Sequence, residues 1–423
     1  MGTAAGAAGA LAMSCGKSGG SAKIDEPVIL AQAPDGPELK AGVIGCGGRG
    51  TGAAINFLKA GPNLKLVAAG DVFEDRLTSS LGRIKKETGA DVPASGRFVG
   101  FDAFEKVIAS GVDIVILATP PHFRAEQFKA AVAAGKHVFM EKPVAVDPVG
   151  IKSVIETAGQ AKTKNLCVVT GTQRHHQKQY LETLARIKSG MIGDIVSARC
   201  YWDMSQLWFR DRKEEWSDME FMIRDWVNWT WLSGDHIVEQ HVHNIDVVNW
   251  FTGKVPTKAV GFGGRHRRVT GDQFDFFSVD FEYDDGMHMQ SYCRQIDGCA
   301  NNVSEFFVGT KGSAYTSASK NSCTIFNLDG TIAWRSEGEE SSPYDQEHVD
   351  MITAIRTSNP LNEARATAES NMLAIMGRIS AYTGKEVTWQ EMMDSDMRIG
   401  PETYALGPVD MEFPIATPGT DKA

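Results

Sequence analysis

One short stretch of the chain concentrates groups that can bind a metal ion or move a proton. Residues 234–246, GDHIVEQHVHNID, hold three of the ten histidines in the sequence. A helix repeats every ~3.6 residues, so His236, Glu239, His243 and Asp246 would form one polar stripe. Such a stripe could be a metal site, an acid/base pair or a solvated helix face.

A metal site built from this stretch alone conflicts with helix geometry. His236, Glu239 and His243 would share a face, but His241 would project to another side of the helix. A single ion could not engage all three imidazoles, although a site could recruit carboxylates from elsewhere in the chain. Hydrogen bonding along the helix or packing is the commoner role for His236 and for His241 taken separately.

A glycine-rich turn at residues 45–50, GCGGRG, has the chemistry of a phosphate cradle. Glycines allow a tight turn and the close approach of a pyrophosphate, which the N-terminus of the following helix stabilises. Asp71 ends the next strand, LKLVAAGD, 21 residues after Gly50. An acid there would bind the adenosine ribose hydroxyls and repel a 2′-phosphate. We therefore expect an NAD site, with Arg76 close enough in sequence to soften the preference over NADP.

Strand-like and helix-like segments alternate from this turn to about residue 165. Buried-strand patterns in VDIVILATPP and KHVFMEKP flank the helix-like RAEQFKAAVAAG. The alternation predicts an α/β Rossmann domain over residues 37–165, a doubly wound parallel sheet with its ligand at the carboxyl ends of the strands. The motifs ATPP and EKP both fall at such ends.

The second half of the chain predicts another domain, over residues 166–423. Between about residues 195 and 335, segments such as FDFFSVDFEYDDGMHMQSYCRQ alternate apolar and polar residues, as antiparallel strands do. Helical periodicity marks residues 345–385. We expect an α+β domain with a large, mostly antiparallel sheet. Two domains are also what a chain of 423 residues usually forms.

The overall charge and hydropathy exclude some classes of function. A net charge of −10 and a pI near 5.5 argue against a nucleic-acid binder, which normally has a basic face. No run of about 18 apolar residues is present, so no helix is expected to span a bilayer. The seven cysteines form no CxxC pair, which disfavours a structural zinc or a redox motif.

Residues 1–36 form an Ala/Gly leader followed by a polar linker. The leader resembles the end of an export signal, and AMSC resembles a degraded lipoprotein cleavage box with Cys15 as the lipidated residue. We expect an exported or periplasmic protein with Cys15 as a candidate lipid anchor, or a cytoplasmic one if the leader is not a signal.

Tryptophans gather around the histidine-rich stretch. Seven of the nine lie between residues 202 and 250, interleaved with arginines and aspartates. Indole rings offer flat apolar area with an N–H at one edge, which suits the CH face of a pyranose. Each tryptophan alone is more often core or loop packing. The cluster as a whole favours a carbohydrate pocket.

Several of these motifs together resemble the glucose-fructose oxidoreductase and inositol dehydrogenase family, called Gfo/Idh/MocA. They are GxGxxG, ATPP, AAGKHVFMEKP, GTQRHHQKQY and IGDIVSARCYW, and the resemblance runs from about residue 40 to residue 388. It implies an NAD-binding Rossmann domain with Lys142 of EKP beside the nicotinamide and the substrate hydroxyl. The family pattern Asp-x-x-x-His-x-x-Asp corresponds here to Glu239, His243 and Asp246, which makes His243 the general base.

The chain departs from the family pattern at three further positions. Arg124 stands where a histidine is frequent, Pro121 replaces the Asn of the TPN motif, and His175 replaces the second Arg of NRR. These departures bear on the nicotinamide environment and on substrate contacts. They leave the phosphate cradle unchanged.

The chemistry of alcohol oxidation agrees with this assignment. A base with a pKa near ambient pH must take the hydroxyl proton as hydride leaves, and histidine provides such a base. Lys142 could polarise the oxygen and stabilise developing alkoxide. Glu239 could orient the imidazole or hold a substrate hydroxyl. No metal is then required.

The resemblance also assigns residues to the cofactor and to the substrate. The predicted cofactor contacts are Gly45, Gly47, Gly48, Arg49, Gly50, Asp71, Thr119, Pro120, His122, Glu141 and Lys142. The predicted substrate contacts are Arg174, His175, Tyr201, Trp202 and Asp246.

We therefore expect an NAD-dependent oxidoreductase, forming a homo-oligomer, that acts on a secondary hydroxyl of a sugar or glycoside, with C3 as one candidate. Three alternatives stay open. A redox-assisted glycosidase would recycle a tightly held NAD and release no net NADH, and a non-catalytic NAD- or sugar-binding module would not need Lys142 or His243. A metal-dependent hydrolase would lose activity with a chelator and ignore NAD.

Overall fold

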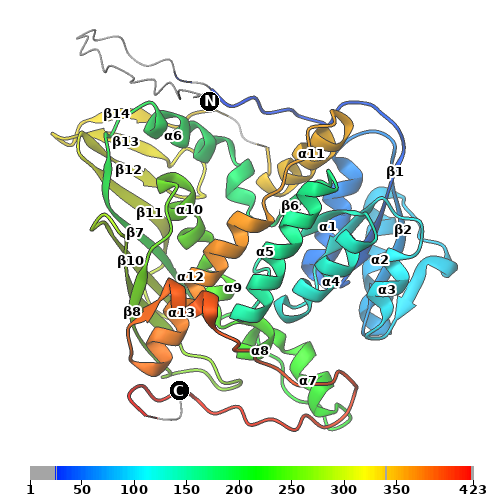
Figure 1. Ribbon diagram of the computed structural model, residues 1–423. Helices are drawn as coiled ribbons and strands as arrows, with labels where there is room; N and C mark the ends of the chain where they lie inside the picture. Colours follow the sequence, from blue (N-terminus) through cyan, green and yellow to red (C-terminus); the bar gives the residue numbers. More distant parts are fainter. Residues whose placement is uncertain (1–23, 25, 339–340, 421–423) are drawn as a thin grey trace, which may run out of the picture.

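Two β-sheets organise the part of the chain that the computed structural model describes, namely residue 24, residues 26–338 and residues 341–420. The first sheet lies in the N-terminal, blue and cyan part of Figure 1, and the second lies on the opposite side of the molecule. Helices from both halves of the chain fill the space between the sheets (Figure 1).

Six parallel strands form the first sheet, in the order β3-β2-β1-β4-β5-β6. The strands are β1 (Leu39–Ile44), β2 (Leu64–Asp71), β3 (Arg97–Val99), β4 (Ile114–Leu117), β5 (His137–Met140) and β6 (Val168–Thr170). The strand order reverses between β1 and β4, where doubly wound sheets bind their ligands. The expected Rossmann sheet is confirmed, and β6 carries it beyond residue 165, the boundary expected from the sequence.

Helices cover both faces of this sheet because its central strands are apolar on both faces. All four residues of β4 and the last four of β1 are buried. The connections are α1 (Gly48–Lys59), α2 (Glu74–Thr88), η1 (Ala94–Gly96), α3 (Ala103–Ile108), α4 (Pro121–Ala133) and α5 (Pro148–Thr163). Each strand therefore delivers its last residues to one edge of the sheet.

Nine strands form the second sheet, in the order β14-β13-β12-β11-β7-β10-β9-β8-β15. Neighbours are antiparallel except β7 and β10, which pair in parallel, so the expected mostly antiparallel sheet is confirmed. The strands are β7 (Ile195–Met204), β8 (Lys258–Gly264), β9 (Phe276–Glu282), β10 (His288–Gln295), β11 (Asn302–Gly309), β12 (Gly312–Thr316), β13 (Thr324–Asn327), β14 (Ile332–Arg335) and β15 (Val387–Thr388).

The helices of the second half lie on one face of this sheet and against the Rossmann domain (Figure 1). They are η2 (Gln173–His176), α6 (Lys178–Lys188), α7 (Asp218–Arg224), η3 (Trp226–Asn228), α8 (Thr230–Ser233), α9 (His236–Glu239), α10 (Val242–Thr252), α11 (Pro343–Arg356), α12 (Ala364–Thr383) and α13 (Trp389–Asp394). The other face of the sheet exposes apolar side chains, among them Val260, Phe262, Phe276 and Val308.

One hydrophobic core runs through both domains. α12 contacts α5 of the Rossmann domain on one side and β8 of the second sheet on the other. Buried residues are therefore found on all sides of α12, and they include Met372, Leu373, Ile375 and Met376. α11 packs on α1 in the same way. In the described ranges, no helix is long and apolar enough to cross a membrane.

The prediction of a single helix over residues 236–246 is wrong. α9 ends at Glu239, and α10 begins only after Gln240 and His241. The His243 N–H donates to the Gln240 carbonyl at 3.2 Å, three residues back, where a continuous α-helix would use the carbonyl of Glu239. The Glu239 carbonyl instead accepts from Lys142. A contact with a distant residue has overridden a locally helical pattern.

Candidate active site

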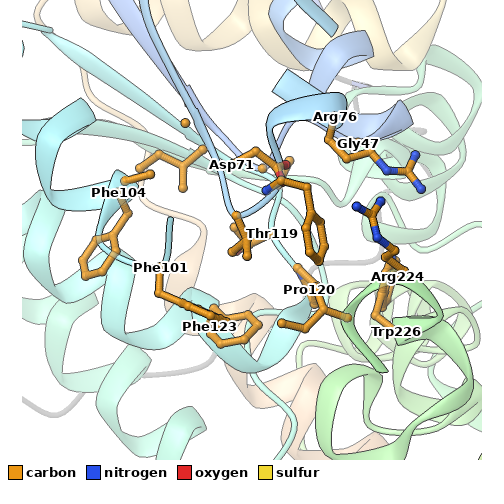
Figure 2. A pocket seen from close by; sticks show the side chains of 18 of the residues that line it. Gly47, Asp71, Arg76, Phe101, Phe104, Thr119, Pro120, Phe123, Arg224 and Trp226 are labelled. Atoms are coloured by element: carbon orange, nitrogen blue, oxygen red, sulfur yellow. The ribbon is translucent and has the colours of Figure 1, made fainter. Parts of the chain in front are cut away.

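A cavity of about 390 Å³ lies at the carboxyl ends of β1, β2 and β4. Figure 2 shows Gly47 and Asp71 in its wall, with Phe101 and Phe123 on one side and Arg224 on the other. The cavity lies where the strand order of the parallel sheet reverses, the place at which this fold receives a dinucleotide.

The glycine-rich turn has the shape that a pyrophosphate needs. Gly45 has a φ of +90°, and a Cβ on Gly50 would lie 1.9 Å from the Gly45 carbonyl oxygen. A Cβ on Gly47 or Gly48 would meet no atom within 4 Å, because both residues border the cavity. The first turn of α1 carries no acidic residue and no side-chain cap. Its N–H groups are thus available to an anion.

Asp71 both faces the cavity and holds the turn in place. Its Oδ2 accepts from the Cys46 N–H at 2.6 Å, and its Oδ1 accepts from the Phe73 N–H at 2.9 Å. Burial raises the pKa of Asp71 above its ordinary value, against the effect of these two hydrogen bonds. Its position at the end of β2 suits an acid that binds ribose hydroxyls.

The second domain supplies part of the cavity wall, which the sequence analysis missed. The contributed residues are Trp208, Arg210, Ile223, Arg224 and Trp226. In the sequence, the signal for this wall is the interleaving of tryptophan with arginine, which was interpreted above as a carbohydrate pocket. At these positions the aromatic and cationic side chains border the same cavity as the glycine-rich turn.

Arg224 fastens this segment to the Rossmann domain. Its two terminal nitrogens each lie 3.0 Å from an oxygen of Asp75 in α2. Its guanidinium carbon lies 3.9 Å from the centre of the Phe73 ring. The hydrogen bond from Arg224 is the main cause that lowers the pKa of Asp75. The wall contributed by the second domain is therefore held against α2.

Arg49 and Glu141, both predicted to contact the cofactor, pair with each other and are not among the residues that line this cavity. Arg49 Nε donates to Glu141, and Arg49 Nη2 donates to Glu347 of α11 at 2.6 Å. Burial raises the pKa of Glu347 well above its ordinary value. The arginine of the glycine-rich turn thus joins the end of β5 to the second domain.

The residues after β4 separate into two groups. Thr119 and Pro120 line the cavity as expected for cofactor contacts. His122 is not part of the lining, because its Nε2 lies 2.6 Å from the Tyr404 hydroxyl oxygen. Burial lowers the pKa of His122 to about 3. The structure therefore places His122 against the C-terminal segment.

Arg124, one of the departures from the family pattern, joins two strand ends. Its guanidinium donates to the carbonyls of Thr119 at 2.8 Å, Glu141 at 3.0 Å and Pro143 at 2.7 Å. The side chain is 4 % exposed. Three carbonyl acceptors satisfy a buried cation that has no carboxylate partner within salt-bridge distance in the described ranges, and they fix the EKP segment relative to β4.

Lys142 connects the end of β5 to the residue before the helix break. Its Nζ lies 3.2 Å from Glu239 Oε1 and also donates to the backbone carbonyl of Glu239. Both side chains are largely buried, at 11 % and 12 % exposure. A buried ammonium with two acceptors has little rotational freedom. The two predicted catalytic residues thus come together from the two domains.

His243 follows Glu239 by four residues, is 7 % exposed and is near enough to Lys142 to feel its charge. Burial and then the charge of Lys142 lower its pKa well below the ordinary value of 6.5. Its ring packs against Trp202, with centroids 5.9 Å apart and planes 24° apart. Within the described ranges no hydrogen bond to its ring nitrogens is found. The imidazole is therefore neutral, and its lowered pKa makes it a weaker base than the histidine with a pKa near ambient pH that the sequence predicts.

His175 and Asp246, two predicted substrate contacts, bind each other. His175 Nε2 lies 2.6 Å from Asp246 Oδ2, and the His175 ring stacks on Trp250 at 4.0 Å. Ser370 donates to the other oxygen of Asp246 at 2.8 Å. The side chain of His175 keeps 16 % of its surface exposed.

Arg174 and Tyr201, two further predicted substrate contacts, each have a partner within the protein. Arg174 is 2 % exposed and donates to Glu305 at 2.8 Å, so its cation is already compensated. Tyr201 stacks on Tyr292 at 5.3 Å. Successive residues of a strand point to opposite faces, and Trp202 occupies the face that packs on His243. The roles of Arg174 and Tyr201 as substrate contacts stay predictions.

The tryptophan cluster does not form one carbohydrate pocket. Trp208 and Trp226 border the cofactor cavity, and Trp202 packs on His243. Trp231 is 2 % exposed in the core, and Trp250 stacks on His175. Although these tryptophans are close in sequence, they lie on different strands, helices and loops and contact different parts of the protein.

His236 and His241 are buried away from a common centre. His236 Nδ1 lies 2.9 Å from Asp235 Oδ1, and His241 Nε2 lies 2.7 Å from Ser291 Oγ. Among the described residues no group of three or more His, Cys, Asp or Glu side chains could hold a metal ion.

Two family descriptions match consecutive parts of the chain. Residues 39–179 match an oxidoreductase family with an NAD-binding Rossmann fold, and residues 180–315 match the GFO/IDH/MocA C-terminal domain. The chain belongs to the Gfo/Idh/MocA oxidoreductase family. The resemblance inferred from the motifs is confirmed, and so is NAD as the cofactor. This member of the family is an NAD-dependent enzyme.

Named relatives of this Gfo/Idh/MocA protein differ in what they act on. It is 23% identical over 285 residues to a scyllo-inositol 2-dehydrogenase (NAD(+)) of Bacillus subtilis, covering 66% of this chain and 73% of that protein. It is 30% identical over 159 residues to a glycosyl hydrolase family 109 protein of Streptomyces niveus, covering 37% and 31%.

A solved structure of the same fold is similar over most of the chain. The scyllo-inositol dehydrogenase of Lactobacillus casei, with bound NAD(H) and scyllo-inositol, is 23% identical at a TM-score of 0.62. The alignment covers 83% of this chain and 99% of that one. At this identity the similarity establishes the two-domain fold.

Proposed function

We propose that this enzyme oxidises a secondary hydroxyl of a sugar, polyol or glycoside, with C3 of a pyranose as one candidate position. The observation that carries the proposal is the convergence of Lys142, Glu239 and His243 from two domains. An ammonium and a neutral imidazole that lie near each other can hold and deprotonate one hydroxyl group. The inositol and glycoside relatives support the substrate class.

The roles follow from the charge of each group. Lys142 would hold the substrate oxygen and stabilise the negative charge that develops on it. His243, neutral because of its lowered pKa, would take the hydroxyl proton. Glu239 would keep Lys142 aimed at the site through its carboxylate and its carbonyl. Bound NAD supplies the acceptor for the hydride.

A substrate panel tests this proposal directly. Purified protein is incubated with NAD and a set of inositols, free sugars and glycosides, and keto products and NADH are measured. A keto product that appears with the wild type and not with Lys142→Met supports the proposal. Absence of any oxidised product, with NAD shown to be bound, would contradict it.

A second candidate function is redox-assisted cleavage of a glycoside. The wall over the cofactor cavity, fastened by Arg224 on Asp75, favours a cofactor that stays bound while a hydroxyl is oxidised and later reduced again. The glycosyl hydrolase family 109 relative supports the same candidate. Release of the aglycone without net NADH would distinguish this function from net oxidation.

We propose export for the native protein, with Cys15 as a lipid anchor. Cys15 lies outside the described residues, and the composition of the leader is the support. Cell fractionation of the native host tests the proposal, and full-length protein found only in the cytoplasm would overturn it.

We also propose a homo-oligomer. The support is the apolar side chains on the open face of the nine-stranded sheet, of which Phe262 is 67 % exposed. Light scattering of the purified protein measures its mass. A monomer at micromolar concentration would contradict the proposal.

A further inference from the structure

A chain of buried hydrogen bonds leads from the second domain to the Lys142–Glu239 pair. Arg268 Nη2 donates to Gln295 Oε1 at 2.7 Å, and Gln295 Nε2 donates to Gln240 Oε1 at 3.0 Å. Gln240 Nε2 then donates to Glu239 Oε2, while Lys142 Nζ lies on Oε1 of the same carboxylate. We call the three residues Arg268, Gln295 and Gln240 the amide relay.

The polarity of the amide relay is fixed by its two ends. A guanidinium has only donors, so the atom of Gln295 that faces Arg268 must be its oxygen. The NH₂ group of Gln295 must then face the oxygen of Gln240, and the NH₂ group of Gln240 must face Glu239. The assignment of each amide is therefore forced by chemistry. With this orientation of the amides, Glu239 accepts a hydrogen bond at each of its two carboxylate oxygens.

The members of the relay are packed where water cannot replace a lost bond. Arg268, Gln295 and Gln240 are 7 %, 2 % and 5 % exposed. Arg268 is itself fixed by the Phe274 carbonyl at 2.7 Å. An amide that loses its partner in such a place must stay unsatisfied or rotate. Loss of one member thus changes the orientation of the next.

We propose that Gln240 and Gln295 are positioning residues of the oxidoreductase: they orient the Glu239 carboxylate and, through it, the Lys142 ammonium. The inference rests on the proposed role of Lys142. It also gives a reason for the break between α9 and α10, since Gln240 lies at the break and turns its side chain into the relay. No member of the relay needs to touch the substrate or NAD.

The first experiment measures Lys142 itself, without a turnover assay. Wild type, Gln295→Met and Gln240→Met are treated with an acylating reagent at pH 8, and modified Lys142 is quantified by peptide mass spectrometry. We expect the acylation rate of Lys142 to rise at least threefold in both variants, because a carboxylate that can rotate holds the amine less firmly.

The second experiment measures the direction of the relay through activity. Gln295→Glu keeps an acceptor for Arg268 but, when ionised, has no donor for Gln240. We expect kcat to fall about tenfold at pH 8 in Gln295→Glu and Gln295→Met, with the KM for NAD unchanged. At pH 6 the glutamate variant should stay impaired, because the neighbouring Arg268 guanidinium keeps the new carboxylate ionised.

Gln273→Met provides the matched control. Gln273 is a buried glutamine at 1 % exposure that donates to Ser233 and to the Val227 carbonyl and has no bond to the relay. It should lower the free energy of unfolding without changing Lys142 acylation or the pH dependence of kcat. Wild-type acylation in folded Gln295→Met and Gln240→Met, or an equal rise in Gln273→Met, would overturn the proposal. Increased acylation in a protein that oxidises no sugar would sink the proposed function and leave the relay standing.

Discussion

The Nζ of Lys142 lies 3.2 Å from Oε1 of Glu239. The segment that follows strand β5 therefore meets the break between two helices of the other domain. The family resemblance assigned both residues to one site, but the direct contact between them, across 97 positions of sequence, was not predicted. The pair fixes the relative position of the two halves of the site.

Lys142→Met should lower kcat by roughly 10²-fold or more, because the charge that stabilises developing alkoxide is lost. The affinity for NAD should change by less than about threefold. Steady-state kinetics and calorimetry measure both quantities. Lys152→Met, which removes a half-exposed lysine bound to Ser395, is the control. Wild-type kcat in Lys142→Met would remove Lys142 from the mechanism.

His243→Ala should likewise lower kcat by about 10²-fold, because the hydroxyl proton then has no neutral base. His288→Ala, at an exposed position paired with Asp280, should leave kcat unchanged. Thermal unfolding should confirm that both variants fold. If His243→Ala keeps its turnover while His288→Ala also does, another group must take the proton.

Asp71→Ala should narrow the preference for NAD over NADP, because the carboxylate that favours ribose hydroxyls is removed. NAD should bind more tightly than NADP to the wild type, and the ratio of dissociation constants should fall at least fivefold in the variant. The Cys46 and Phe73 N–H groups lose their acceptor, so binding of both cofactors should weaken. Tighter binding of NADP by the wild type would contradict the role of Asp71.

Arg224→Gln should release NAD faster, because the bond that holds the second-domain wall against Asp75 is lost. We expect the dissociation rate, measured by stopped-flow displacement, to rise about tenfold. Arg212→Gln removes an exposed arginine paired with Asp218 outside the cavity lining and serves as control. Equal rates for wild type and Arg224→Gln would show that the wall does not limit release.

Acid should destabilise the protein below about pH 6.5. Burial lowers the pKa of His122 and of His241 to about 3, whereas the same residues in the unfolded chain titrate near 6.5. The unfolded state therefore binds more protons between these values, and each histidine removes about 1.4 kcal/mol of unfolding free energy per pH unit. Urea unfolding at pH 7 and pH 5 should differ by a few kcal/mol.

The pKa of His176 is shifted in the opposite direction, so His176 should not offset the loss of stability at acid pH. Burial alone would lower its pKa, but the carboxylates of Glu363 and Asp350 raise it to about 10. Its stabilisation is complete below pH 6.5 and is lost as the pH rises through 10. His241→Gln should flatten the acid slope, and an unchanged slope would assign the acid sensitivity to other groups.

Periodicity and motif spacing predicted what depends on neighbours along the chain. The Rossmann sheet, the antiparallel sheet and the positions of Asp71 and Lys142 at strand ends all follow from local patterns. The helix break at Gln240 was missed because its cause, the contact between Lys142 and the Glu239 carbonyl, lies 97 positions away.

Side-chain roles were harder to predict because a residue type does not reveal its partner. Arg174 and His122 have the chemistry of ligand contacts, yet Glu305 and Tyr404 already bind them. Arg210 and Trp226 carried no cofactor motif, and they reach the cavity only because α7 is held on α2 through Arg224 and Asp75. Such choices depend on tertiary packing, which one sequence does not encode as a local pattern.

The continuous core around α12 limits how the molecule can move. Because α12 is buried between α5 and β8, opening the two domains as a hinge would expose Met372, Leu373 and their neighbours to water. The free energy needed for this exposure would arise over the whole interface between the two domains. Residues 205–213 and the stretch around Tyr404, which lie beside the cavity and belong to no strand or helix, could be displaced without opening this core. Exchange of ligand is therefore expected at these surface segments and not by opening of the two domains.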